Sequence, residues 1–249
     1  MNKYLILSFT LFCLWSCENN ETPPVLDSKD ETTKKEMVDS SVKTPESSKY
    51  SAEIIPEKMT VQEKKERFRQ LIVPAVKQVF GELDQQYKQV KALIKKDTNS
   101  DRIKTLKKEY KAESNEDLLL RLKPHPVSIV LAQAAMESAW ATSRFFKEAK
   151  NIFGVWSFDK NEPRIAAGEK RGKKTIWLKK YKSIEAAVRD NYRVLARGAA
   201  FKKFRKLRMQ SNNPFEIVKG LDKYSELGAK YGKELSAVIR FNKFNQFDL

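Results

Sequence analysis

Apolar residues recur at helical spacing along most of the chain after residue 60. Thr60 is a favourable N-cap residue, and Glu63 three positions later completes a capping-box pattern. Between Phe68 and Ile94 the apolar positions follow with the period of an amphipathic helix. The pattern therefore predicts one long helix, or two helices in line, that begins after Thr60.

Further helices are expected after a break at Asn99-Ser100-Asp101. The spacing predicts a second helix over about 101–110 and a third over 115–122. From 127 to about 146 nearly every residue is apolar, small or a strong helix former, and Pro126 suits a first helical turn. We therefore expect one continuous helix over this last segment.

The pattern changes in the second half of the chain. Residues 155–158 and 175–178 are rich in aromatic and β-branched side chains, which predicts the two strands of a hairpin. Residues 201–208 alternate apolar and basic side chains in the manner of a basic amphipathic helix. Such a helix presents either a solvated charged face over an apolar stripe or a binding surface for anionic lipid or polymer.

The first seventeen residues have the features of a bacterial export signal. Lys3 precedes an apolar run over 4–15, which is shorter than the roughly 20 residues that a membrane-spanning helix needs. The run ends at Leu14-Trp15-Ser16-Cys17, which resembles a lipobox, so Cys17 is expected to be lipidated and to begin the mature protein. Trp15 is unusual in that motif, and a cleaved signal without lipid is the alternative.

A polar segment over 18–50 follows the signal. It is rich in Glu, Asp, Lys, Ser, Thr and Pro, and it holds eight acidic and five basic residues. Such a composition buries too little apolar surface to offset the entropy of ordering, so we expect a disordered tether. The net charge of +17 therefore resides in the rest of the chain, and it favours attraction to polyanions.

The residue inventory excludes several chemistries. The two cysteines, Cys13 and Cys17, both belong to the signal segment, so the mature domain is expected to contain no disulfide. His125 is the single histidine, which excludes a multi-histidine zinc site and a Ser-His-Asp triad. No phosphate-binding glycine loop is present. We therefore predict no metal and no cofactor, and export makes nucleic acid an unsuitable partner.

Glu137 is the single charged residue between positions 127 and 143. In a continuous helix Gln133 and Trp140 would share its face. A carboxyl group in such apolar surroundings keeps its proton to higher pH, and this property makes the catalytic glutamic acid of lysozyme a general acid. A solvated glutamate, or an ion pair with Arg144, is the structural alternative.

The segment around Glu137 resembles the signature of bacterial glucosaminidase domains, which occur in flagellar muramidases and autolysins. The resemblance rests on several motifs across residues 56–246, and the chain is most similar to the bacterial Bax-type proteins, which carry a similar helical region ahead of the domain. The motifs are Ala-Gln-Ala-Ala-Met-Glu-Ser-Ala-Trp at 132–140, Asn-Ile-Phe-Gly at 151–154, Tyr-Lys-Ser-Ile-Glu-Ala-Ala at 181–187, Asp-Asn-Tyr at 190–192, and the segments 224–226 and 231–242.

The resemblance implies a mainly α (α+β) fold: a lysozyme-like helical domain over 123–246 with a small β-hairpin lobe, preceded by a helical region over 56–122. It implies hydrolysis of the β-1,4 bond after N-acetylglucosamine in peptidoglycan, with Glu137 as the general acid. The protein is then expected to be a monomer in the cell envelope. It would be anchored to a bacterial membrane through Cys17, face the periplasm or the exterior, and act on glycan strands in cell-wall remodelling.

Glycosidases also need a second carboxylate or a substrate acetamide to stabilise the oxocarbenium ion or activate water. The hairpin offers Asp159, Glu162 and Glu169, of which Glu169 is favoured, although it equally suits a solvated loop acid. Tyr192 resembles a family tyrosine that lines the cleft and is a third catalytic candidate, with burial in the core as its alternative.

The substrate-binding candidates combine aromatic, amide and glycine residues. Aromatic rings stack on sugar faces, although such rings are also common in protein cores. Asn151 is expected to fix the loop beside Glu137 through its side-chain amide. The residues predicted to bind substrate are Gln133, Trp140, Asn151, Phe153, Gly154, Trp156 and Tyr181.

Two other functions are compatible with these residues. A lytic transglycosylase would use Glu137 in the same way but cleave after the muramic acid and leave an anhydro end. A non-catalytic peptidoglycan-binding lipoprotein would keep Glu137 as a structural residue. Fold alone does not separate these activities, because one scaffold can host all of them.

Overall fold

The computed structural model describes residues 50–171 and 174–248, with the backbone alone for 169–171 and 174. The predicted signal over 1–17 and nearly all of the predicted tether over 18–50 lie outside the described residues. The α-helices are α1 (Val61–Lys96), α2 (Asp101–Tyr110), α3 (Asn115–Leu122), α4 (Val127–Glu137), α5 (Arg144–Ala149), α6 (Ile184–Arg197), α7 (Lys202–Gln210), α8 (Pro214–Ile217) and α9 (Ala229–Phe241). The remaining elements are the strands β1 (Arg164–Arg171) and β2 (Lys174–Lys179) and the 3-10 turns η1 (Ala199–Phe201), η2 (Val218–Gly220) and η3 (Phe244–Phe247).

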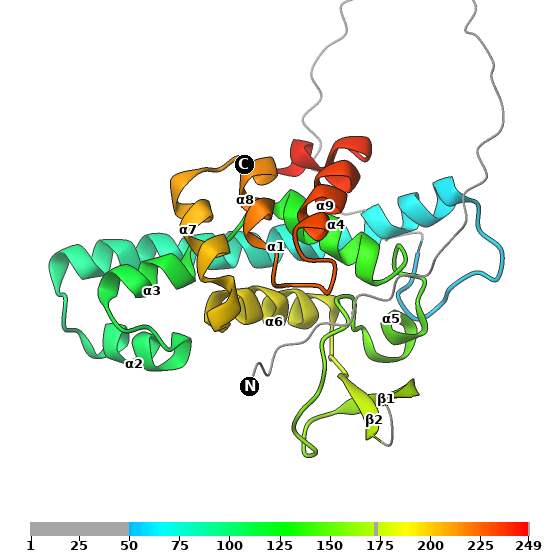
Figure 1. Cartoon of the computed structure of the whole chain (residues 1–249), viewed down its shortest axis with the longest axis horizontal. Helices are drawn as coiled ribbons and strands as arrows, with labels where there is room; N and C mark the ends of the chain where they lie inside the picture. The colour runs from blue at the N-terminus through cyan, green and yellow to red at the C-terminus, as the bar shows by residue number, and fades with distance from the viewer. Residues whose placement is uncertain (1–49, 172–173, 249) are drawn as a thin grey trace, which may run out of the picture.

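The predicted mainly helical fold with a small β lobe is confirmed. In Figure 1 α1 runs along the length of the helical body, and the hairpin of β1 and β2 projects from one side of it. The Thr60–Glu63 capping box forms with both of its hydrogen bonds, and α1 is one helix. Ser100 and Ser114 cap α2 and α3 as their positions predict. No described helix is long and apolar enough to cross a membrane.

Helix α1 is part of the main hydrophobic core. Phe68, Ile72, Val76 and Val79 are fully buried, and they share one cluster with α4, α6, α9 and η3. The far end of α1 packs through Val90 against α2 and α3 in a second, smaller cluster. The predicted domain boundary between residues 122 and 123 remains a prediction. In the structure α1 packs into the same core as the predicted catalytic domain.

The hairpin differs from the predicted one. β2 covers the expected 175–178, but its partner is β1, which pairs with it in antiparallel register from Arg164↔Lys179 onwards. The predicted first strand at 155–158 was wrong, since Trp156 forms only a single bridge, to Leu178. The side-chain amide of Asn151 explains this path. It donates to the carbonyls of Val155 and Lys179 at 2.9 Å each and accepts from the Val155 amide at 2.9 Å, which holds the loop across β2.

Candidate active site

Glu137 is the last residue of α4, and the predicted continuation of the helix to about 146 was wrong. The Ser138 hydroxyl donates to the Ala134 carbonyl at 2.5 Å and accepts from the Ala141 amide at 2.8 Å. Residues 139–141 then adopt φ values of 50°, 62° and 59°. Each left-handed residue other than glycine costs about 1–2 kcal/mol, so surrounding contacts must hold this turn. The turn directs the chain away from the axis of α4, so Glu137 lies at the end of that helix.

Arg67 of α1 supplies one of those contacts, and nothing in the sequence pattern predicted it. Its guanidinium is fully buried and donates to the Ala141 carbonyl at 2.7 Å. It also donates to the carbonyls of Ser51 at 2.7 Å and Ile54 at 3.3 Å. Three backbone acceptors thus replace the carboxylate that a buried arginine usually requires. Arg67 links α1 and the segment before it to the turn that follows Glu137.

The Glu137 carboxyl accepts a hydrogen bond from a tyrosine that is distant in the sequence. Tyr231 of α9 is fully buried and donates its hydroxyl to Oε1 of Glu137 at 3.0 Å. Gly232 lets α9 pack closely against η2, because a Cβ at that position would lie 2.8 Å from the Val218 carbonyl oxygen. Tyr224 stacks on the Tyr231 ring with centroids 5.0 Å apart. The carboxyl is therefore fixed from one side by a buried aromatic pair.

Buried polar groups extend this arrangement. Gln133, one turn before Glu137, donates to the Tyr231 hydroxyl at 3.4 Å and accepts from the Asn191 amide at 3.3 Å. The Tyr224 hydroxyl donates to the side-chain amide oxygen of Asn191 at 3.4 Å. All four of these partners are buried. A satisfied buried network of this kind rigidifies the groups it joins, so we call Glu137, Gln133, Asn191, Tyr224 and Tyr231 the Glu137 network.

The Glu137 carboxyl retains its proton to unusually high pH. Burial raises its pKa to about 8, although the hydrogen bond from Tyr231 opposes the shift. No cation in the described part of the chain forms an ion pair with it, so the alternative of a Glu137–Arg144 pair was wrong. Arg144 instead pairs with Glu148 at 3.0 Å. Glu137 as a residue is partly exposed, and a carboxyl that is mostly protonated at neutral pH can donate a proton.

Tyr192 does not join the network, contrary to its predicted catalytic role. Its ring is buried against His125, with centroids 4.3 Å apart, and its hydroxyl donates to the His125 carbonyl at 3.2 Å. Successive residues of a helix point about 100° apart. Asn191 faces Gln133, and Tyr192 consequently faces a different part of the molecule.

The candidates for a second carboxylate are not brought to Glu137 by any described contact. Glu162 lies 3.8 Å from the Lys179 ammonium, and Asp159 accepts from the Asn161 amide at 2.9 Å within a turn. The backbone of Glu169 lies in β1, but its side chain is outside the described part of the structure. Its predicted role stays a prediction.

Tyr181 is also directed elsewhere. Its hydroxyl donates to Asp190 at 2.7 Å, and Lys179 donates to the same carboxylate oxygen at 3.0 Å. This contact anchors the end of β2 to α6. A structural role in joining the hairpin to the helical body therefore accounts for Tyr181.

The predicted sugar-stacking aromatics separate into two groups. Phe153 is fully buried in the core, whereas Trp140 is partly buried and packs edge-on against Phe68 with ring centroids 5.2 Å apart. Gly154 has a φ of 64°, which explains a glycine at this turn. Trp156 is partly exposed and lies beside the exposed Phe158, with ring centroids 6.1 Å apart.

The prediction from sequence missed Tyr231, Tyr224 and Asn191 as site residues, although all three lie in motifs that carry the family resemblance. A detectable signal was present, since each is a hydrogen-bonding side chain within an otherwise apolar, core-facing pattern. Such residues need partners when buried. Their partners come from helices far apart in the chain, and this is why spacing alone did not identify them.

Comparison with known proteins gives one family match. The model of the family Glucosaminidase, described as mannosyl-glycoprotein endo-beta-N-acetylglucosaminidase, matches residues 116–244. That span contains the whole Glu137 network. No curated protein matches the chain.

Several solved structures are similar over part of the chain. The catalytic domain of the autolysin Auto from Listeria monocytogenes has 16% identity and a TM-score of 0.49, covering 77% of this chain and 92% of its own. A truncated glycoside hydrolase domain of FlgJ from Salmonella typhimurium has 19% identity and a TM-score of 0.38, covering 55% and 93%. A mutant peptidoglycan hydrolase from Sphingomonas sp. A1 has 20% identity and a TM-score of 0.36, covering 49% and 84%.

Proposed function

The chain belongs to the glucosaminidase family of glycoside hydrolases, and from this we propose that it is an endo-β-N-acetylglucosaminidase that cleaves the β-1,4 bond after N-acetylglucosamine in peptidoglycan. The observation that supports the proposal best is the state of Glu137. It is a carboxyl group at a helix end, without a cationic partner among the described residues, whose pKa burial raises to about 8. A glycosidase needs such a proton donor.

In the proposed mechanism Glu137 transfers its proton to the glycosidic oxygen as the bond to the anomeric carbon breaks. The leaving sugar then departs as a neutral alcohol, and the positive charge develops on the ring oxygen and anomeric carbon. Tyr231 holds one oxygen of the carboxyl, which leaves the other free to face the substrate. Water adds to the anomeric carbon and gives up a proton, and Glu137 regains a proton before the next turnover, so the net reaction is hydrolysis.

The group that assists the water is part of the proposal. Glu169 is our first candidate, because β1 carries it on the lobe that projects beside the helical body. The substrate acetamide is the alternative. A Glu169→Gln variant that hydrolyses peptidoglycan at the wild-type rate would exclude Glu169 and leave the acetamide.

Peptidoglycan as substrate is supported by the predicted export signal and by charge. The formal net charge is +17, and the basic excess lies outside the segment 18–50. A positive surface attracts an acidic cell-wall polymer. Lipid attachment at Cys17, a location in the cell envelope and a monomeric state belong to the same proposal. Loss of labelled-palmitate incorporation in Cys17→Ser would test the attachment.

Digestion of purified peptidoglycan tests the reaction. We expect residues 50–249 to release muropeptides with N-acetylglucosamine at the reducing end, identified by borohydride reduction and mass spectrometry. Products that end in anhydromuramic acid would instead identify a lytic transglycosylase. Glycan binding without any product would identify a binding protein and would refute the enzymatic proposal.

The pH dependence provides a test of the acid itself. A general acid works while protonated, so activity should fall as pH rises through about 8, the pKa of Glu137. Tyr231→Phe removes the hydrogen bond that lowers this pKa, and its alkaline limb should move to higher pH. We expect its maximal rate to fall about tenfold, because the carboxyl is less well oriented.

The measurement is the initial rate of peptidoglycan solubilisation across the pH range for both proteins. Tyr110→Phe is a suitable control, since this buried tyrosine lies outside the Glu137 network. An alkaline limb that stays in place or moves to lower pH in Tyr231→Phe would contradict the assignment of Tyr231 as the partner of the acid.

A further inference from the structure

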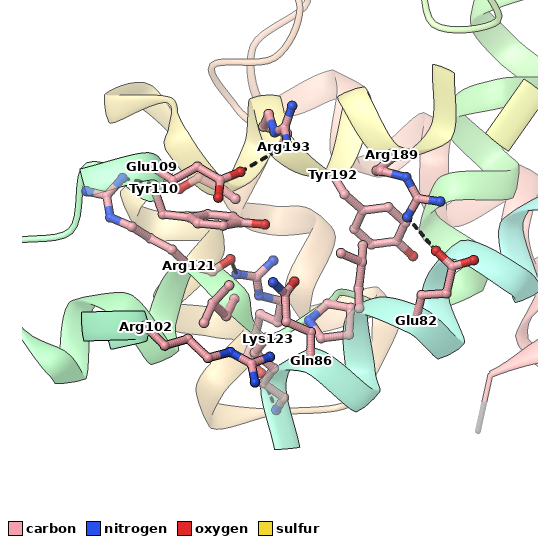
Figure 2. Close-up of a pocket in the computed structure, with 15 residues that line it drawn as sticks. Glu82, Gln86, Arg102, Glu109, Tyr110, Arg121, Lys123, Arg189, Tyr192 and Arg193 are labelled. Atoms are coloured by element: carbon pink, nitrogen blue, oxygen red, sulfur yellow. Dashed lines mark hydrogen bonds and ion pairs between the residues drawn. The ribbon is translucent and has the colours of Figure 1, made fainter. Parts of the chain in front are cut away.

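A cavity of about 390 Å³ lies outside the Glu137 network. Figure 2 shows it between helices of the N-terminal region and α6, with Tyr110 on one side and Tyr192 on the other. Its size is within the range of small-molecule sites. We call it the basic pocket, and its charged lining residues are Glu82, Arg102, Glu109, Arg121, Lys123, Arg189, Arg193 and Arg208.

Three of the cations that line the basic pocket have carboxylate partners. Arg189 pairs with Glu82 at 2.6 Å, and Arg193 pairs with Glu109 at 3.0 Å (Figure 2). Arg121 pairs at 2.8 Å with Asp117. Within each pair the two charges neutralise each other, so these arginines are not free to balance the charge of a ligand.

Arg102, Lys123 and Arg208 form no ion pair within the described part of the chain. The Arg102 guanidinium donates to the Gln89 amide oxygen at 3.3 Å. The Lys123 ammonium donates to the Arg208 carbonyl at 2.8 Å. Burial lowers the pKa of Lys123 and the charge of the Asp84 carboxylate opposes this shift, but Asp84 forms its ion pair with Lys88, at 2.6 Å. The pocket is therefore lined by three positive charges that lack a counter-anion.

Arg208 is the most unusual of these cations, because its side chain is 1% exposed. It donates to the Leu120 carbonyl at 2.6 Å, but Nε has no hydrogen-bond partner among the described residues. Burial, with a smaller contribution from Arg205, lowers its pKa to about 9. A buried, uncompensated cation is costly, and an anion placed beside it would offset that cost.

We propose that the basic pocket binds a small organic phosphate monoester. A phosphate monoester carries about −1.5 to −2 charges at neutral pH, which complements the unpaired cations. The volume exceeds what a phosphate group alone would fill, and the rings of Tyr110 and Tyr192 provide apolar walls for an organic body. The proposal does not rest on the enzymatic activity, because the pocket shares no residue with the Glu137 network.

Isothermal titration of the full-length protein with glucose 6-phosphate tests the proposal. We expect saturable binding that is tighter than that of inorganic phosphate. Lys123→Gln and Arg102→Gln should each weaken it about tenfold or more, the usual value of one charge-assisted hydrogen bond. Both side chains are exposed or partly exposed, so both variants should keep the fold, which a melting curve verifies.

Lys147→Gln is the matched control, since it removes the same charge from an exposed position on α5. Equal weakening in this control would show nonspecific attraction to a basic protein and would overturn the proposal. So would the absence of saturable binding, or binding of citrate in place of the phosphate ester. A second arm uses phosphatidylcholine vesicles with and without phosphatidic acid. Binding to phosphatidic acid alone would assign the phosphate to a lipid head group, and binding of the soluble ester would assign it to a free metabolite.

Discussion

Glu137→Gln should lower the rate of peptidoglycan hydrolysis by about 10²–10⁴-fold, the usual contribution of general acid catalysis. The amide has the shape of the carboxyl and can keep a contact with Tyr231, but it cannot transfer a proton to the leaving oxygen. The measurement is release of reducing ends from purified peptidoglycan. Glu148→Gln is the control, because it removes an exposed carboxylate that pairs with Arg144 on α5.

The same variant should be more stable than the wild type at alkaline pH. The folded-state pKa of Glu137 is about 8, above the ordinary value of 4.5, so the folded protein holds a proton that the unfolded chain releases. Wild-type stability therefore declines as pH rises from about 4.5 to about 8. Glutamine does not ionise, so the variant does not lose stability as the pH rises. We expect its free energy of unfolding to exceed that of the wild type by on the order of 1–3 kcal/mol at pH 9, and this difference should disappear near pH 4.

Denaturant unfolding at the two pH values measures this difference. A Glu137→Gln protein that is inactive and also less stable than the wild type at pH 9 would indicate a structural role for the carboxylate. Wild-type activity in Glu137→Gln would remove Glu137 from the mechanism altogether. An inactive but stabilised variant is the result that the geometry predicts, because burial that raises the pKa serves the chemistry at the expense of stability.

Removal of α1, α2 and α3 by starting the chain at Lys123 should abolish cooperative folding. The deletion takes away Phe68, Ile72, Val76 and Val79, each fully buried in the core shared with α4 and α9. Burial of one such side chain contributes about 1.5–3 kcal/mol, and four together match the 5–15 kcal/mol by which a typical domain is stable. The uncovered apolar face of α4 should also promote aggregation.

Thermal unfolding followed by circular dichroism, together with size-exclusion chromatography, measures the effect against residues 50–249. Phe68→Ala gives a milder comparison in the intact chain, with an expected loss of about 3–5 kcal/mol. A soluble, monomeric protein from 123 to 249 with a sharp unfolding transition would contradict this prediction. It would show that the division predicted between 122 and 123 separates independently folding units.

Local signals in the sequence determined the first helices and pointed to Glu137 as the proposed acid. Thr60 and Glu63 begin α1 because a capping box satisfies backbone groups within four residues, and Ser100 and Ser114 act in the same way for α2 and α3. Glu137 was identifiable because it is a lone charge in an apolar segment that matches a family motif. None of these inferences needs a contact between distant parts of the chain.

The tertiary structure decided where α4 ends and what surrounds Glu137. Residues 138–146 favour helix by composition, but Arg67 from α1 and the Ser138 hydroxyl stabilise a left-handed turn instead. Tyr231 reaches Glu137 from 94 positions away. Both Tyr231 and Tyr192 lie in family motifs. The packing of α6 and α9 decides that Tyr231, and not Tyr192, contacts Glu137.

The tertiary structure also decided the pairing of β2 with β1 and the charge of the basic pocket. Arg102, Lys123 and Arg208 are unremarkable in the sequence, and they face one cavity only because α1, α2, α3, α6 and α7 surround it. Spacing along the chain encodes which residues share a helix face. Burial, ion pairing and pKa depend on which faces meet, and side chains from several helices decide that together.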